Sequence, residues 1–255
     1  MNPFGRSAVV YPRPRPNAAV RLFCLPYAGG GATVFRGWPD LLPVEVEVAA
    51  VQLPGREGRM KEAPLTSMSD VVAAVTAAVL ADAHVDRPFA LFGHSMGALV
   101  AYEVTRELEG RRERAPAWLF VAGHGAPHLH RAEPRIHDAP EEEFTARLRS
   151  LAGTPDEILE RSDLMDVLLP LLRADFEVCE TYEFRAGAPL STPITAVGGL
   201  ADTLTPRRHL EAWRDVTNGT FQLRLLPGGH FFLNERPDLL LRALTADLFA
   251  GVLSQ

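Results

Sequence analysis

Residues 89–102 read FALFGHSMGALVAY, and this stretch decides the fold. The apolar run before Gly93 suits a buried strand, and the residues after Gly97 follow the spacing of a buried helix. Between them lies a G-x-S-x-G pentapeptide centred on Ser95. In this context the pentapeptide is typical of a nucleophile elbow, a turn so tight that it needs glycine two residues on either side of the serine. We prefer this interpretation to a chance match in a glycine-rich turn, and it predicts that the Ser95 hydroxyl is presented at the carboxyl edge of a sheet.

Short apolar runs alternate with longer helical patterns along the rest of the chain. That alternation is typical of an α/β fold in which a mostly parallel sheet is covered by helices on both faces. The expected strands are Val20–Leu25, Val46–Leu53, Pro88–Phe92, Trp118–Ala122, Ile194–Gly198 and Phe221–Leu226. The expected helices are Ser67–Ala83, Met96–Glu109, Pro206–Val216 and Arg236–Leu253. Ser67 suits an N-cap position and Pro206 the first turn of a helix.

The interval from residue 125 to residue 189 contains no strand-like run. Three helical segments follow one another there, and they are opened by Asp138-Ala139-Pro140, by Thr154-Pro155-Asp156-Glu157 and by Ser162. We interpret residues 125–189 as a helical lid inserted into a core formed by residues 19–124 and 190–255, with residues 1–18 as an extended N-terminal segment. Leucines recur at helical spacing in the third segment. We expect them to pack the lid onto the core, and Leu164 and Leu168 are also candidates for contact with the substrate.

The composition limits the class of protein. The chain has 255 residues, of which 47% are hydrophobic and 23% charged, and its formal net charge is -6, which fits one soluble globular unit. The acidic balance argues against nucleic acid as a partner, because phosphate binding needs a basic face. No apolar run resembles a signal peptide or reaches the ~18 residues of a membrane span, so we expect a cytoplasmic protein with no membrane partner. Cys24 and Cys179 lie in apolar neighbourhoods and are expected to be buried thiols.

A serine hydroxyl becomes a nucleophile when a base takes its proton, so a histidine oriented by a carboxylate must complete the site. In this topology the carboxylate and then the histidine follow the serine along the chain. We predict His230 as the base, because it stands on the glycine-rich loop after the last expected strand. His94 lies within the elbow and cannot easily face the neighbouring hydroxyl. His128 and His130 form an H-x-H pair, but no ligand at suitable spacing accompanies them, so we expect no metal site.

The carboxylate is predicted to be Asp202, in the loop after the penultimate expected strand. Loops at the carboxyl ends of strands build the sites of such sheets. The competing location, the end of the strand 118–122, offers only Gly123-His124-Gly125. A turn residue ahead of Pro206 is the alternative interpretation of Asp202, since aspartate is common in turns.

The oxyanion that forms when the serine attacks needs two preorganised N–H donors. The elbow predicts the amide of Met96 as one donor. The loop after the first expected strand, which reads LPYAGGG over residues 25–31, supplies the other, and we choose the amide of Ala28. A phosphate-binding loop is the alternative for this glycine run, but no G-K-[S/T] follows it. Tyr27 and Phe231 are candidate substrate-binding residues.

With these elements in place the sequence resembles the α/β-hydrolases, and four motifs narrow the resemblance to the type II thioesterases, the editing enzymes of polyketide and nonribosomal peptide synthesis. The motifs are residues 25–30 (LPYAGG), residues 52–57 (QLPGRE) with Arg59, residues 93–98 (GHSMGA) and residues 228–233 (GGHFFL). The resemblance covers roughly residues 20–253. It implies the same triad and oxyanion donors as the reasoning above. Arg56 receives no chemical role, and an arginine that fixes a loop near the site explains it at least as well.

The resemblance also implies the substrate and the partner. The substrate is an acyl group on the phosphopantetheine thiol of an acyl carrier protein or peptidyl carrier protein, and its hydrolysis needs no metal or cofactor in the enzyme. We expect a monomer. Arginines near residues 106–114 and at residues 207–208 are candidates for docking an acidic carrier, although solvated helix ends are the commoner role. Two alternatives stay open, a general esterase or acyltransferase of the same fold that acts on small acyl esters, and a noncatalytic hydrolase-like binding module.

Overall fold

The central sheet has the predicted, mostly parallel character. The computed structural model describes residues 7–82, 87–112, 114–129, 134–151 and 159–253. Its sheet has the strand order β1-β3-β2-β4-β5-β6-β7. The strands are β1 (Val9–Val10), β2 (Val20–Leu25), β3 (Val46–Val51), β4 (Phe89–His94), β5 (Trp118–Ala122), β6 (Ile194–Gly199) and β7 (Phe221–Leu226). All neighbours are parallel except β1, which pairs antiparallel with β3 at the sheet edge. Strand β1 lies within the segment that the sequence analysis described only as extended.

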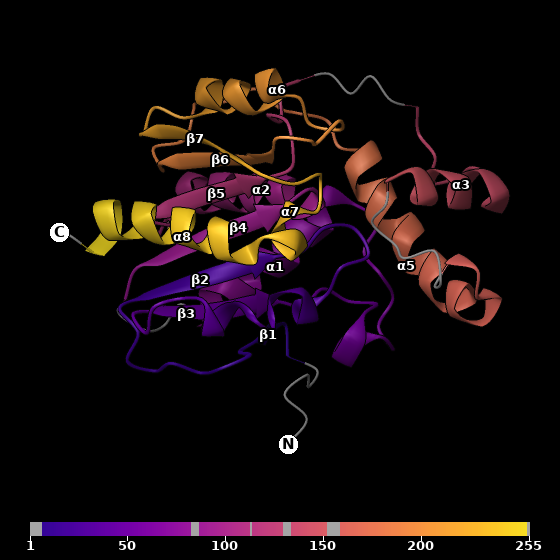
Figure 1. The fold of residues 1–255 in the computed structure, drawn as a ribbon, viewed down its shortest axis with the longest axis horizontal. Helices are drawn as coiled ribbons and strands as arrows, with labels where there is room; N and C mark the ends of the chain where they lie inside the picture. The colour runs from indigo at the N-terminus through magenta and orange to yellow at the C-terminus, as the bar shows by residue number, and fades with distance from the viewer. Residues whose placement is uncertain (1–6, 83–86, 113, 130–133, 152–158, 254–255) are drawn as a thin grey trace.

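Helices cover both faces of this sheet (Figure 1). On one face lie α1 (Met68–Asp82), α2 (Met96–Gly110), α6 (Arg207–Glu211) and the 3-10 helix η4 (Ala212–Val216). On the other face lie α8 (Pro237–Leu248), the short helix α7 (Phe232–Glu235), and the 3-10 helices η1 (Ala32–Phe35) and η2 (Trp38–Asp40). A π-helical turn, η5 (Phe249–Leu253), extends α8, and η3 (Glu57–Arg59) lies in the loop between β3 and α1. The Ser67 hydroxyl accepts the Asp70 N–H at 3.1 Å, which confirms the predicted N-cap of α1.

Each central strand contributes side chains to two cores. In β4, Phe89 and Leu91 pack in the cluster that contains α1 and α2, whereas Ala90 and Phe92 pack in the cluster that contains α8. Successive side chains of a strand point to opposite faces, so a strand covered on both sides must be apolar along its whole length. This burial explains the continuous apolar runs in the sequence. It also places the carboxyl end of β4 in the middle of the sheet, between β2 and β5.

Two further helices, α3 (Glu141–Leu151) and α5 (Ser162–Glu180), lie to one side of the sheet (Figure 1). We propose that they belong to the lid inferred for residues 125–189. The helical segment expected to open at Thr154 lies outside the described residues. Seven buried apolar side chains of this region form a separate cluster, which contains Ile136, Phe144, Leu148, Leu159, Met165, Leu169 and Leu172. Among the described residues we find no helix with the length and hydropathy of a membrane span.

Candidate active site

Ser95 stands in a strained turn between β4 and α2. Its backbone angles are φ 53° and ψ -116°, a combination that residues other than glycine rarely adopt. Both flanking glycines are required by close packing. A Cβ atom on Gly93 would lie 1.9 Å from the Gly97 carbonyl oxygen, and one on Gly97 would lie 2.3 Å from the Leu25 carbonyl oxygen. The Ser95 N–H donates to the Ala122 carbonyl at 2.8 Å, so the neighbouring strand also fixes the turn.

Asp202 and His230 lie in contact, although they are 28 residues apart in the sequence. His230 Nδ1 is 2.9 Å from Asp202 Oδ2. The other carboxylate oxygen accepts the N–H groups of Leu204 at 2.9 Å and Thr205 at 3.2 Å. Burial raises the pKa of Asp202, but the hydrogen bond and charge of His230, together with the two amides, outweigh it and leave the pKa below its ordinary value. The carboxylate is therefore ionised and directed at Nδ1, which leaves Nε2 of the ring for the cavity side.

The loops that carry these two residues pack against each other. The Ala201 N–H donates to the Gly228 carbonyl at 2.9 Å. A Cβ atom on Gly199 would lie 2.3 Å from the Gly229 carbonyl oxygen, so the loops after β6 and β7 approach more closely than a side chain would allow. Their glycines are thus a structural requirement for the contact between Asp202 and His230.

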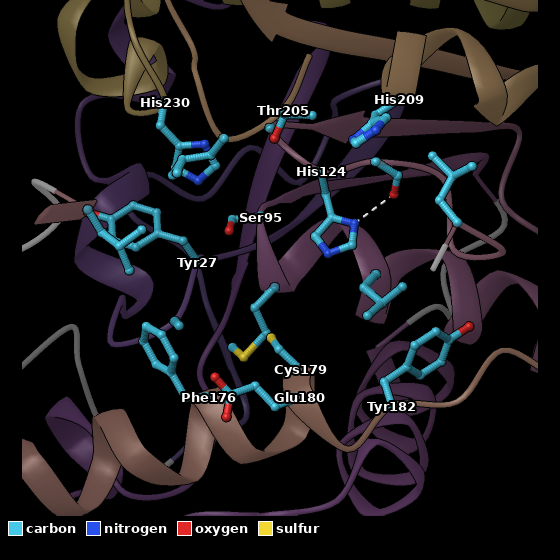
Figure 2. A pocket seen from close by; sticks show the side chains of 18 of the residues that line it. Tyr27, Ser95, His124, Phe176, Cys179, Glu180, Tyr182, Thr205, His209 and His230 are labelled. Carbon is cyan, nitrogen blue, oxygen red and sulfur yellow. Dashed lines mark hydrogen bonds between the residues drawn. The ribbon is translucent and has the colours of Figure 1, made fainter. Parts of the chain in front are cut away.

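Ser95, His230, Ala28 and Met96 all line one cavity of about 840 Å³. Figure 2 shows Ser95 between the His230 ring on one side and Phe176 and Cys179 of α5 on the other. Met96 is the first residue of α2, where the N–H groups have no acceptor within the helix. Ala28 lies in a turn that the Gly30 N–H closes onto the Tyr27 carbonyl at 2.9 Å. The structure thus brings the predicted nucleophile, base and oxyanion donors to the same cavity.

Helices α3 and α5 contribute the opposite wall of this cavity. The lining side chains from α3 and α5 are Arg147, Leu148, Leu151, Leu172, Phe176, Cys179 and Glu180. Tyr27 and Phe231, the two aromatic candidates for substrate binding, line the wall on the side of His230, and their ring centroids are 5.0 Å apart. A cavity of this size lies within the range of small-molecule sites.

Leu164 and Leu168 do not line this cavity. Leu164 is exposed, and Leu168 packs against the apolar cluster of the lid. From α5 the cavity instead receives Leu172, Phe176 and Cys179, which follow one another at helical spacing of four and three residues. The leucine pattern identified the helix correctly, but the pattern repeats along the helix and cannot indicate which turn faces the site.

The structure corrects the prediction for one cysteine and adds three residues to the wall of the cavity. Cys24 is buried as predicted, whereas Cys179 is only half-buried and lines the cavity. His124 and Thr205 line the cavity from loops and His209 lines it from α6 (Figure 2), and no local motif in the sequence marks them as site residues. His128 Nε2 lies 3.6 Å from Asp215 Oδ2, and His130 is outside the described residues. Within the described ranges no three potential ligand side chains are grouped as a metal ion would require.

Known proteins resemble this chain over most of its length. The thioesterase domain family matches residues 20–248. Gramicidin S biosynthesis protein GrsT of Aneurinibacillus migulanus is 44% identical over 218 residues, which cover 86% of this chain and 84% of that protein. Thioesterase PikA5 of Streptomyces venezuelae is 40% identical over 223 residues, or 88% of this chain and 79% of that protein.

A solved structure agrees with these relatives. The type II thioesterase BorB from the borrelidin biosynthetic cluster superposes with a TM-score of 0.85 at 35% identity, over 95% of this chain and 98% of that one. The predicted α/β-hydrolase fold and the resemblance to type II thioesterases are thereby confirmed. By sequence, by fold and by the extent of the match, the chain belongs to the thioesterase domain family.

Proposed function

We propose that this protein is an editing thioesterase that hydrolyses stalled or aberrant acyl groups from the phosphopantetheine thiol of acyl carrier or peptidyl carrier proteins. The observation that carries the proposal is the placement of Ser95 in a strained turn at a cavity that is also lined by His230, whose ring is held by the Asp202 carboxylate, and whose far wall is the lid. The relatives named for gramicidin S and borrelidin biosynthesis support the class of pathway.

In the mechanism that we propose, His230 takes the Ser95 proton as the hydroxyl oxygen attacks the thioester carbonyl. Asp202 holds the Nδ1 side of the ring, so that Nε2 is the basic nitrogen and the imidazolium that forms is stabilised. The amides of Ala28 and Met96 donate to the oxyanion of the tetrahedral intermediate. Its collapse breaks the carbon–sulfur bond, and the acyl group remains on Ser95.

Water then hydrolyses the acyl-serine through the same steps. The departing thiol has a pKa of about 8.5, so it leaves far more readily than an amine and needs less assistance from an acid. The acyl chain lies in the cavity between the core and the lid, and the phosphopantetheine arm remains part of the carrier protein. All groups that this chemistry requires are side chains and amides of the protein.

The test is turnover of an acyl-phosphopantetheinyl carrier protein, followed by the release of its free thiol. We expect release by the wild type and a fall on the order of 10⁴- to 10⁶-fold for Ser95→Ala, with unchanged melting temperature, because the acyl-serine can no longer form. Absence of release by the wild type, or release by Ser95→Ala at the wild-type rate, would overturn the proposal. Faster turnover of small oxygen esters than of the carrier-bound thioester would favour a general esterase instead.

A further inference from the structure

Arg56 and Asp175 form a buried ion pair beside the turn that carries Ala28. Arg56 comes from the loop between β3 and α1, Asp175 comes from helix α5, and their side chains are only 4% and 2% exposed. Arg56 Nη2 lies 2.8 Å from Asp175 Oδ1, and Arg56 Nη1 lies 2.9 Å from Asp175 Oδ2. This bidentate arrangement satisfies both carboxylate oxygens. The mechanism above gives the pair no role.

Both members of the pair also bind the backbone of the turn. The Gly29 N–H donates to Asp175 Oδ2 at 2.7 Å, and Arg56 Nη1 donates to the Gly30 carbonyl at 2.9 Å. The turn spans residues 27–30, and Gly29 has a φ of +77°, as the third residue of a type II turn requires. Two consecutive residues of the turn are therefore fixed by one buried ion pair.

This arrangement determines where the Ala28 N–H points. In a planar trans peptide, the Tyr27 carbonyl and the Ala28 N–H point in opposite directions. The Gly30 N–H holds the Tyr27 carbonyl inside the turn, so the Ala28 N–H is directed out of it. We find no hydrogen bond donated by the Ala28 amide to any other described residue, and Ala28 lines the cavity with Ser95. The amide is thus oriented and available for an oxyanion.

The lid helix and the loop of Arg56 enclose the turn from outside. A Cβ atom on Gly29 would lie 2.5 Å from Leu172 Cδ2, so α5 packs directly on the turn, one helical turn before Asp175. Next to Arg56, Glu57 Oε1 accepts the N–H of Thr33, three residues after the turn, at 3.0 Å. The position of α5 and the geometry of the turn are therefore coupled.

We propose that Arg56 and Asp175 are positioning residues for the hydrolysis, through which the seating of α5 sets the direction of the Ala28 amide. This inference rests on the proposed function. It makes the lid helix part of the oxyanion machinery as well as a wall of the cavity. A pair that serves only to stabilise the fold is the competing explanation, and the two explanations differ in what they predict for kcat.

The double variant Arg56→Met/Asp175→Leu separates stability from positioning. Replacing both members of a buried ion pair by apolar residues is often neutral or stabilising, whereas removal of one member leaves an uncompensated charge. We expect the double variant to fold and to lose less stability than either single variant, because it leaves no buried charge and loses only the hydrogen bonds to the Gly29 N–H and the Gly30 carbonyl. Its kcat on an acyl-pantetheine thioester should fall about 10- to 100-fold, because a displaced donor costs less than the 100- to 1,000-fold loss of a donor removed outright. The KM should change by less than about threefold, since the side chains that line the cavity are unchanged in this variant.

A second readout reports the oxyanion directly. The Ser95 oxygen adds to the carbonyl carbon of a trifluoromethyl ketone analogue of the acyl chain, its proton passes to His230, and the ketone oxygen becomes the oxyanion of a tetrahedral adduct. Its Ki should rise by the same factor by which kcat/KM falls, since both depend on the amide donors. Arg56→Lys provides a milder variant, which keeps the charge but cannot make the bidentate contact together with the bond to Gly30. We expect its kcat to fall about three- to tenfold and its Ki to rise by about the same factor.

Asp247→Asn is the matched control. Asp247 is a buried carboxylate that pairs with Arg224 and accepts the Thr195 hydroxyl at 2.9 Å, and none of these three residues lines the cavity. It should lower the melting temperature without changing kcat or Ki. A folded double variant, or a folded Arg56→Lys, with kcat and Ki within twofold of wild type would overturn the inference, as would a change confined to KM. Absence of thiol release by the wild type would instead overturn the proposed function itself.

Discussion

The elbow and the lid line the same cavity, but they are held in place by different contacts. Strand β4 and helix α2 lie in the middle of the molecule, and their side chains pack into the large clusters on the sheet. Helices α3 and α5 pack mainly into the separate cluster of the lid. From α5, Val178 joins the core and Asp175 reaches the turn of Ala28. The nucleophile therefore stands between elements packed into the two large clusters of the sheet, and the cavity wall opposite it stands on helices that pack mainly into a cluster of their own.

This difference indicates that the core and the lid have different tasks in the reaction. A group that stabilises a transition state must be held closely in position, and dense packing on both faces of a sheet provides that. We expect the wall that admits acyl groups to move relative to the core, and a cluster of its own would stay intact when it moves. Variants in the core should accordingly change kcat for every acyl group, whereas variants in the lid wall should change KM in a way that depends on the acyl chain.

Among the variants that compare the core with the lid, Asp202→Asn is expected to have the largest effect, and it tests the core. Turnover should fall on the order of 10⁴-fold for short and long acyl chains alike, because the amide no longer holds His230 in the right tautomer. Steady-state kinetics with two acyl lengths measures this. Asp238→Asn, an exposed carboxylate paired with Arg236, is the control and should retain full activity. Near-normal turnover by Asp202→Asn would place the acid elsewhere.

Amide exchange tests the difference in packing itself. We expect the described amides of α3 and of the first half of α5 to exchange about two orders of magnitude faster than those of β4 and β5, because local opening of the lid leaves the sheet intact. Exchange followed by mass spectrometry on the native protein resolves these segments. Equal protection of the lid amides and the sheet amides from exchange would contradict this difference between the lid and the core.

A smaller effect is expected for Phe176→Ala, which removes part of the acyl wall. The Phe176 ring lines the cavity and packs edge-on against Phe144, with ring centroids 5.3 Å apart. The KM for long acyl chains should rise about tenfold with kcat little changed, since the contact is made equally in ground and transition states. Val167→Ala, at an exposed position of the same helix, should leave both constants unchanged. A fall in kcat with constant KM would show that the lid acts on chemistry at this position too.

The smallest effect concerns His94, which is completely buried and whose ring centroid lies 5.1 Å from that of His230. Burial, followed by the charge of nearby His230, holds its pKa well below the ordinary value of 6.5, while Asp202 acts in the opposite direction. The unfolded chain therefore binds a proton below about pH 6.5 that the folded chain does not, so this residue makes folding less favourable as the pH falls. One such proton changes the free energy of unfolding by at most about 1.4 kcal/mol per pH unit.

We expect His94→Gln to flatten the dependence of stability on pH between about pH 5 and pH 7 relative to the wild type. Urea unfolding at several pH values measures the difference between the two proteins. Parallel curves would indicate that His94 becomes protonated in the folded core.

Much of the core was predictable from the sequence because its signals are local. The strand Trp118–Ala122 was predicted with its observed bounds, and β4 with its elbow follows from one pentapeptide between an apolar run and a helix. Strand β1 was missed because Val9 and Val10 are too few for a pattern, and the strand exists through its pairing with β3. The helix expected from Pro206 to Val216 is divided into α6 and η4.

The sequence by itself determined the kind of fold, the elbow at Ser95, and the candidates His230 and Asp202. Glycine spacing and apolar periodicity are local features, and the order of the serine, the carboxylate and the histidine can be followed directly along the chain. Only the tertiary structure decided which turn of α5 lines the cavity, since every turn of an amphipathic helix has the same pattern. It alone revealed the role that we infer for Arg56, whose partner Asp175 lies 119 residues away. An ion pair between segments so distant leaves no periodic trace in the sequence, because its two halves meet only when the lid is packed on the core.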